Sequence, residues 1–172
     1  MARRRAVRRT ATEIIGLRFE NASDSVYNMI DSMVTTYFTD LTNAKIKALF
    51  DMKKRKAGGQ LVLGRLQKSN DLIRRLTVEE ARGEEGYDYV MYIDKKAWDL
   101  MAEIDRQRLI RHELNHADVD PEKKNPYGMK DHDVKDFAEE IRRNQDDINW
   151  ASRVATLVEN VYDQERENRS EE

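Results

Sequence analysis

Residues 109–117 read Leu-Ile-Arg-His-Glu-Leu-Asn-His-Ala, a segment in which polar and apolar residues recur at helical spacing. His112 and His116 are four residues apart, so a helix would place both imidazoles on one face, where they can bind a single ion. The opposite face would carry three apolar residues, Ile110, Leu114 and Ala117. The segment therefore predicts an amphipathic helix with a buried apolar side and a metal-binding side.

The residue types on the polar side indicate the chemistry of the site. Zinc accepts imidazole nitrogen, and in catalytic sites it takes three protein ligands and leaves one position for water. Glu113 follows the first histidine, so its carboxylate would project beside the ion and accept a proton from the attacking water. His112 and His116 are therefore candidate zinc ligands, and Glu113 is the candidate general base.

This five-residue pattern, HExxH, also occurs by chance in helices that bind nothing. Two features argue against chance: the predicted helix has distinct polar and apolar faces, and it follows a predicted strand. In addition, the chain has only three histidines, and two of them belong to the pattern. We therefore expect a functional metal site.

The remaining histidine, His132, is the predicted third ligand. The loop before it, residues 119–130, contains both prolines of the chain and a glycine, so it can reverse the chain direction. Asp131 could cap a helix over residues 132–143. The acidic alternatives for the third ligand are Asp118, Asp120, Glu122, Asp131, Asp133, Glu139 and Glu140. We favour His132 because imidazole suits zinc, and we expect Asp133 to cap the helix or to orient a ligand.

The other segments predict an α+β fold. Apolar periodicity predicts helices over residues 23–38, within 69–85, from Trp98 to about Val119 with or without a break, and over 146–166. Alternation and β-forming residues predict strands over residues 44–52, 60–66 and 87–94. A glycine-containing turn over residues 53–59 would join the first two strands in a hairpin. We expect a small antiparallel or mixed three-stranded sheet packed on the motif helix, with flanking N-terminal and C-terminal helices.

Composition limits the classes of protein and of site. The chain has 172 residues, which is enough for one domain, and it has no cysteine. Disulfides and thiolate ligands are therefore excluded, so any metal must be held by His, Asp or Glu. No apolar run reaches the roughly 18 residues that a membrane span needs, and we recognise no secretory signal. These features favour a cytoplasmic protein without a membrane segment.

Charge is balanced overall, with 33 acidic and 31 basic residues, but it is uneven along the chain. Five arginines lie near the N-terminus: Arg3, Arg4, Arg5, Arg8 and Arg9. We expect residues 1–20 to form a disordered basic arm, residues 21–166 a single domain and residues 167–172 a charged disordered tail. The arm could contact nucleic-acid phosphates or could only keep the chain in solution, and the basic turn Lys53–Lys56 has the same two explanations.

Three parts of the sequence resemble the putative phage metallopeptidase family. They are Tyr87–Asp94 with the following Trp98, the segment Arg108–His116, and His132-Asp-Val-Lys-Asp-Phe137. That family is similar to the SprT-like zincins, in which a His-Gly-x-x-aromatic motif follows HExxH and provides the third ligand. Here His132 and Phe137 are the counterparts, with Asp133 in place of the glycine and the aromatic residue one position later.

The resemblance covers roughly residues 44–143 and implies a zincin-like fold and a zinc-dependent peptidase. Zn²⁺ would be held by the three histidines, with Glu113 as general base, and the substrate would be a protein or peptide; SprT-like members include enzymes that act on proteins attached to DNA. In such a fold the strand over residues 87–94 would border the cleft and pair with an extended substrate. Tyr127 could donate to the oxyanion, although packing is the more common role of such a tyrosine.

A second class of function is a non-catalytic binding protein built on the zincin scaffold. Such a protein would hold a structural metal and bind nucleic acid or a host factor. A structural zinc needs no general base and no open position. The presence of Glu113 beside the two histidines therefore favours the peptidase.

Overall fold

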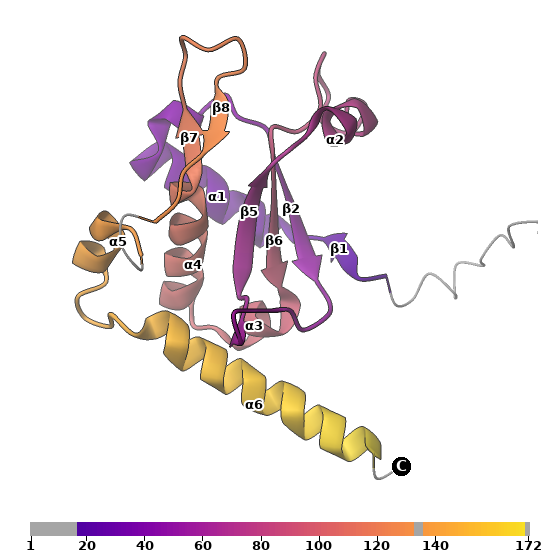
Figure 1. Cartoon of the computed structure of the whole chain (residues 1–172), viewed down its shortest axis with the longest axis vertical. Coiled ribbons are helices and arrows are strands. Elements are labelled where there is room, and N and C mark those ends of the chain that lie inside the picture. The colour runs from indigo at the N-terminus through magenta and orange to yellow at the C-terminus, as the bar shows by residue number, and fades with distance from the viewer. Residues whose placement is uncertain (1–16, 133–135, 171–172) are drawn as a thin grey trace, which may run out of the picture.

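The computed structural model describes residues 17–132 and 136–170. Their centre is a four-stranded mixed sheet in the order β1-β2-β6-β5 (Figure 1). The strands are β1 (Phe19–Asn21), β2 (Ile46–Asp51), β5 (Gly64–Lys68) and β6 (Tyr89–Asp94). β2 and β6 are parallel, and the other two pairs are antiparallel. The α+β class predicted from the sequence is therefore confirmed.

The predicted three-stranded arrangement is wrong, because the sheet has a fourth strand and residues 44–52 and 60–66 do not pair in a hairpin. β6 lies between them, next to β2 on one side and β5 on the other. Nearly all of its side chains are buried, and a central position keeps more apolar surface from water than an edge does. The predicted turn instead forms a separate small hairpin, β3 (Lys56–Ala57) and β4 (Gln60–Leu61), around two glycines at positive φ.

At both limits of the described residues, regular structure extends into segments where disorder was expected. β1 overlaps the arm expected over residues 1–20, because Phe19 already pairs with Asp51. The five N-terminal arginines lie outside the described residues. At the other end, α6 (Trp150–Ser170) continues into the tail expected over residues 167–172.

Four helices contribute to the core together with the sheet: α1 (Asp24–Tyr37), α3 (Lys95–Leu100), α4 (Glu103–Asn115) and α6. Their apolar faces meet side chains of β2, β5 and β6 in one hydrophobic cluster. A short 3-10 turn, η2 (Thr39–Leu41), follows α1, and α2 (Asp71–Leu76) lies near one end of the sheet (Figure 1). α6 packs against α3 and α4. In the described part of the chain, no helix is both long and apolar enough to cross a membrane.

The chain leaves α4 earlier than predicted. The helix expected to reach Val119 is broken between α3 and α4 and ends at Asn115. The expected loop over residues 119–130 contains part of a hairpin, β7 (Ala117–Val119) and β8 (Tyr127–Met129). Both prolines lie in its connection, where the missing N–H disrupts no ladder hydrogen bond.

The segment after this hairpin also differs from the prediction. The helix expected over residues 132–143 begins only at Ala138, as α5 (Ala138–Arg143). Asp131 does not cap it, because Phe137 occupies the N-cap position. His132 therefore lies in an irregular segment rather than in the first turn of a helix.

The apolar back of α4 is buried as predicted. Ile110 and Leu114 are fully buried, and Ala117, just beyond the helix, is 6% exposed. The burial of this face orients α4 about its axis and so determines the direction of its polar face.

Truncation of this buried face tests the orientation of α4. Ile110→Ala should lower the free energy of unfolding by about 2–5 kcal/mol, because the lost side chain leaves a cavity in the core. Ile148→Ala makes the same change at a side chain that is 65% exposed, and its effect should stay within about 0.5 kcal/mol. Urea unfolding followed by circular dichroism measures both, and equal losses would contradict the buried orientation.

Candidate metal centre

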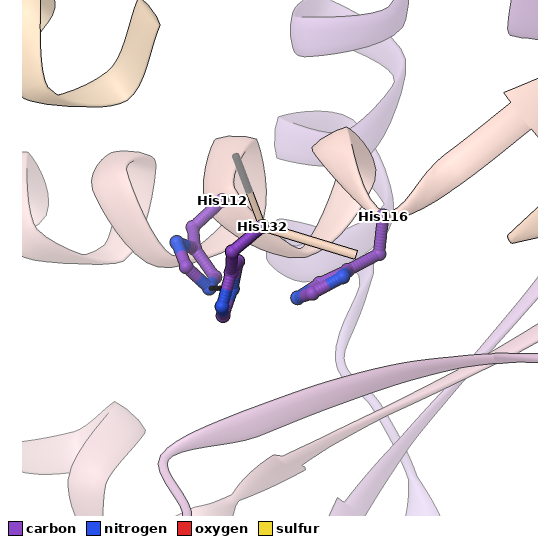
Figure 2. Close-up of side chains that lie close together, drawn as sticks. All are labelled: His112, His116 and His132. Carbon is purple, nitrogen blue, oxygen red and sulfur yellow. Dashed lines mark hydrogen bonds between the residues drawn. The ribbon is translucent and has the colours of Figure 1, made fainter. Parts of the chain in front are cut away.

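Three histidines from two parts of the chain converge at the end of α4. His112 lies in the last turn of the helix, His116 is the residue that caps it, and His132 lies between β8 and α5. Figure 2 shows the three imidazoles close together. One ligand nitrogen from each lies within 4.8 Å of the others, and the Nε2 atoms of His112 and His132 are 3.2 Å apart. These residues could hold a metal ion.

Two of the imidazoles are oriented by partners outside the metal face. Nδ1 of His112 is 2.9 Å from Oδ1 of Asp136, and Nδ1 of His116 is 3.0 Å from the carbonyl oxygen of Lys130. A proton on each Nδ1 can be donated to these oxygens, which leaves both Nε2 atoms as acceptors for an ion. The donor set therefore fits a metal that prefers nitrogen ligands.

The charge state of the site follows from burial and from these partners. Burial lowers the pKa of His112, but the hydrogen bond to Asp136 and the nearby carboxylate of Glu113 outweigh it, so the net shift of that pKa is upward. Burial is the main cause of the lowered pKa of His116. The lowered pKa favours the neutral form of His116, the form in which histidine binds a metal.

Asp136 was not singled out from the sequence, which assigned the orienting role to Asp133. Asp133 lies outside the described residues. The pattern around His132 offers several acidic residues, and only the path of the chain decides which of them meets an imidazole. The aromatic counterpart Phe137 does contact the site: its ring centroid lies 4.9–5.6 Å from those of all three histidines.

Glu113 lies beside the histidines and points toward the sheet. Its side chain is almost fully buried, and the backbone N–H of Leu66 in β5 donates to its Oε2 at 2.9 Å. A Cβ atom on Gly64 would lie 3.3 Å from Cγ of Glu113, so this glycine allows β5 to approach the helix closely. Burial raises the pKa of Glu113, although the charge of His112 opposes the shift. A raised pKa suits a carboxylate that must take up a proton near neutral pH.

The acidic alternatives that belong to the described residues are used elsewhere or lie outside the histidine group. Glu140 is 1% exposed and binds Nε of Arg111 at 2.8 and 2.9 Å and Nδ2 of Asn115 at 3.1 Å, which fastens α5 to α4. Glu139 pairs with Arg143. Among the described residues, the group that could hold a metal contains the three histidines and no acidic residue.

The structure bears on two expectations about the surroundings of the site, the strand that would bind a substrate and the role of Tyr127. The strand expected to receive a substrate, β6, has neighbours on both sides, and the edge strand next to Glu113 is β5. Tyr127 packs edge-to-face on Tyr89, with 5.7 Å between ring centroids. It has the packing role that was the alternative to oxyanion binding.

Comparison with known proteins agrees with this geometry. A family model described as putative phage metallopeptidase matches residues 17–162, which include all three histidines and Glu113. No curated protein and no solved structure matches the chain. The match covers most of the sequence, and the chain therefore belongs to the putative phage metallopeptidase family.

Proposed function

We propose that this chain is a zinc-dependent peptidase with a zincin-like fold, in which His112, His116 and His132 bind zinc and Glu113 is the general base. The observation that carries the proposal is the convergence of three imidazoles beside a buried carboxylate. Zinc is the metal of choice because catalytic zinc sites commonly use three protein ligands, and imidazole is a preferred one. Kinship with SprT-like zincins and a cytoplasmic location, in the host if the chain is phage-encoded, remain predictions from the sequence.

The reaction follows from the position of the base. When bound, zinc would polarise the scissile carbonyl and bring the pKa of water toward about 7. Glu113 accepts a proton from the attacking water while the water oxygen bonds to the carbonyl carbon. Glu113 then gives that proton to the departing amine as the carbon–nitrogen bond breaks. The hydrogen bond from Leu66 holds the carboxylate in place, and its burial keeps it from being fully hydrated.

The edge of β5 supports an extended peptide as the substrate. On either side of β5, the carbonyl of Leu63 accepts from the N–H of Asp94 in β6, and the N–H of Ser69 donates to the carbonyl of Asp88 just before β6, both at 2.8 Å. The alternate residues Gly64, Leu66 and Lys68 therefore direct their backbone groups away from β6. The N–H of Leu66 binds the general base, and the remaining outward groups could pair with an extended substrate beside the metal site.

The alternative remains a non-catalytic binding protein with a structural metal. Nucleic-acid contact in either case would depend on the arginine-rich arm, which lies outside the described residues. The second basic segment, Lys53–Lys56, forms ion pairs within the chain. Lys54 and Lys56 pair with Asp163 and Glu159 of α6 at 3.3 and 2.6 Å. The buried carboxylate of Glu113 favours the peptidase, because a structural metal needs no base.

Removal of the third histidine tests the ligand set. His132→Ala should weaken zinc binding at least about 100-fold, since even groups that only orient ligands contribute about 10–100-fold. Asp131→Asn alters the neighbouring acidic alternative and should leave the affinity nearly unchanged. Competition with a chromogenic chelator measures both affinities. Full zinc binding by His132→Ala would exclude His132 as a ligand.

Replacement of Glu113 distinguishes a peptidase from a non-catalytic binding protein. Glu113→Gln should retain zinc and slow peptide cleavage by about 10²–10⁴-fold, the usual contribution of a general base. Glu122→Gln, at an exposed position in the β7–β8 connection, is the matched control and should cleave normally. New termini in a mixed peptide pool, counted by mass spectrometry, give the rates. A zinc-loaded wild type that produces none would favour the binding protein.

A further inference from the structure

The β7–β8 hairpin is the physical link between the second and third histidines. Its base is closed at His116 itself: the N–H of Lys130 donates to the carbonyl of His116 at 2.9 Å, and the imidazole of His116 meets the carbonyl of Lys130 at 3.0 Å. His132 follows two residues after Lys130. Any tilt of the hairpin relative to α4 would therefore change the separation of the two imidazoles.

One phenol joins this hairpin to the sheet. The hydroxyl of Tyr89, at the start of β6, lies 3.1 Å from the carbonyl oxygen of Asp118 in β7 and 2.9 Å from that of Gly128 in β8. Its single proton is shared between the two strands, which are directly paired at this position. Tyr89 is fully buried, and its ring packs on Tyr127 of β8.

The described part of the chain shows no other side-chain hydrogen bond between the sheet and the hairpin strands. Phenylalanine would fill the same space in the core, so packing alone does not account for the hydroxyl. Burial raises the pKa of Tyr89, so the phenol keeps the proton that it donates. The hydroxyl is thus a buried donor whose partners lie on both strands between two metal-binding residues.

We propose that Tyr89 is a positioning residue that sets the separation of His116 and His132 by fastening both strands of the hairpin to β6. Tyr89 does not touch the metal and acts through the backbone of residues 117–130. The inference rests on the proposed metal centre, because the separation of the two histidines matters only if both bind one ion.

The first test compares two tyrosines that bridge backbone groups. Tyr89→Phe should weaken zinc binding about 10–100-fold, as removal of ligand-orienting groups usually does. Tyr27→Phe is the matched control, because the Tyr27 hydroxyl donates to the carbonyl of Ala48 at 3.2 Å and accepts from its N–H at 3.1 Å, away from the hairpin. Its zinc affinity should equal that of the wild type. Unfolding of both metal-free variants checks that each remains folded.

A double-mutant cycle separates positioning from general loosening. In a His132→Ala background the hairpin no longer holds a ligand in place, so Tyr89→Phe should cause no further loss of zinc affinity. An equal loss in both backgrounds would show that Tyr89 has only a structural role. The inference alone fails if the wild type binds zinc and Tyr89→Phe binds it equally well. A wild type that does not bind zinc overturns the metal centre and, with it, this inference.

Discussion

The geometry of the candidate site depends on helix α4, which is buried on two of its sides. The apolar back of α4 packs on the sheet and α1, which determines the direction of its polar face. On another side, Arg111 is buried with Glu140 of α5, and a buried charge is tolerated only when it is paired and hydrogen-bonded. Loss of either partner would leave the other charge buried alone, so this pair favours one placement of α5. That placement brings Asp136 and Phe137, which precede α5, against the histidines.

The candidate metal centre therefore draws on a helix, a hairpin and a sheet edge. The helical spacing of His112 and His116 provides two imidazoles locally. The hairpin brings back His132, and the edge of β5 approaches closely enough for its backbone to hold Glu113. Much of the orientation comes from main-chain groups, namely the carbonyl of Lys130 and the N–H of Leu66. Such groups are present at almost every position, so they leave no mark in the sequence.

This division explains which features could be predicted. The motif and its amphipathic helix depend on residue types and local spacing, and the structure agrees with both. The approach of His132 depends instead on a chain reversal, which the proline- and glycine-containing loop indicated, and the three histidines do lie together. The insertion of β6 between β2 and β5 depends on pairing between distant segments, which the alternation within each strand does not determine. The start of α5 and the role of Asp136 were missed because the acidic residues after His132 are equally suited to capping a helix and to hydrogen bonding with an imidazole. The sequence does not decide between these two roles.

X-ray absorption at the zinc edge of the zinc-loaded protein tests the central claim most directly, because it counts the ligands of the ion. Three imidazole nitrogens and at least one oxygen should be found at about 2.0–2.2 Å, the coordination of a site that keeps a position open for water. A site closed by four protein ligands, or one with fewer than three imidazoles, would contradict a catalytic centre built from His112, His116 and His132.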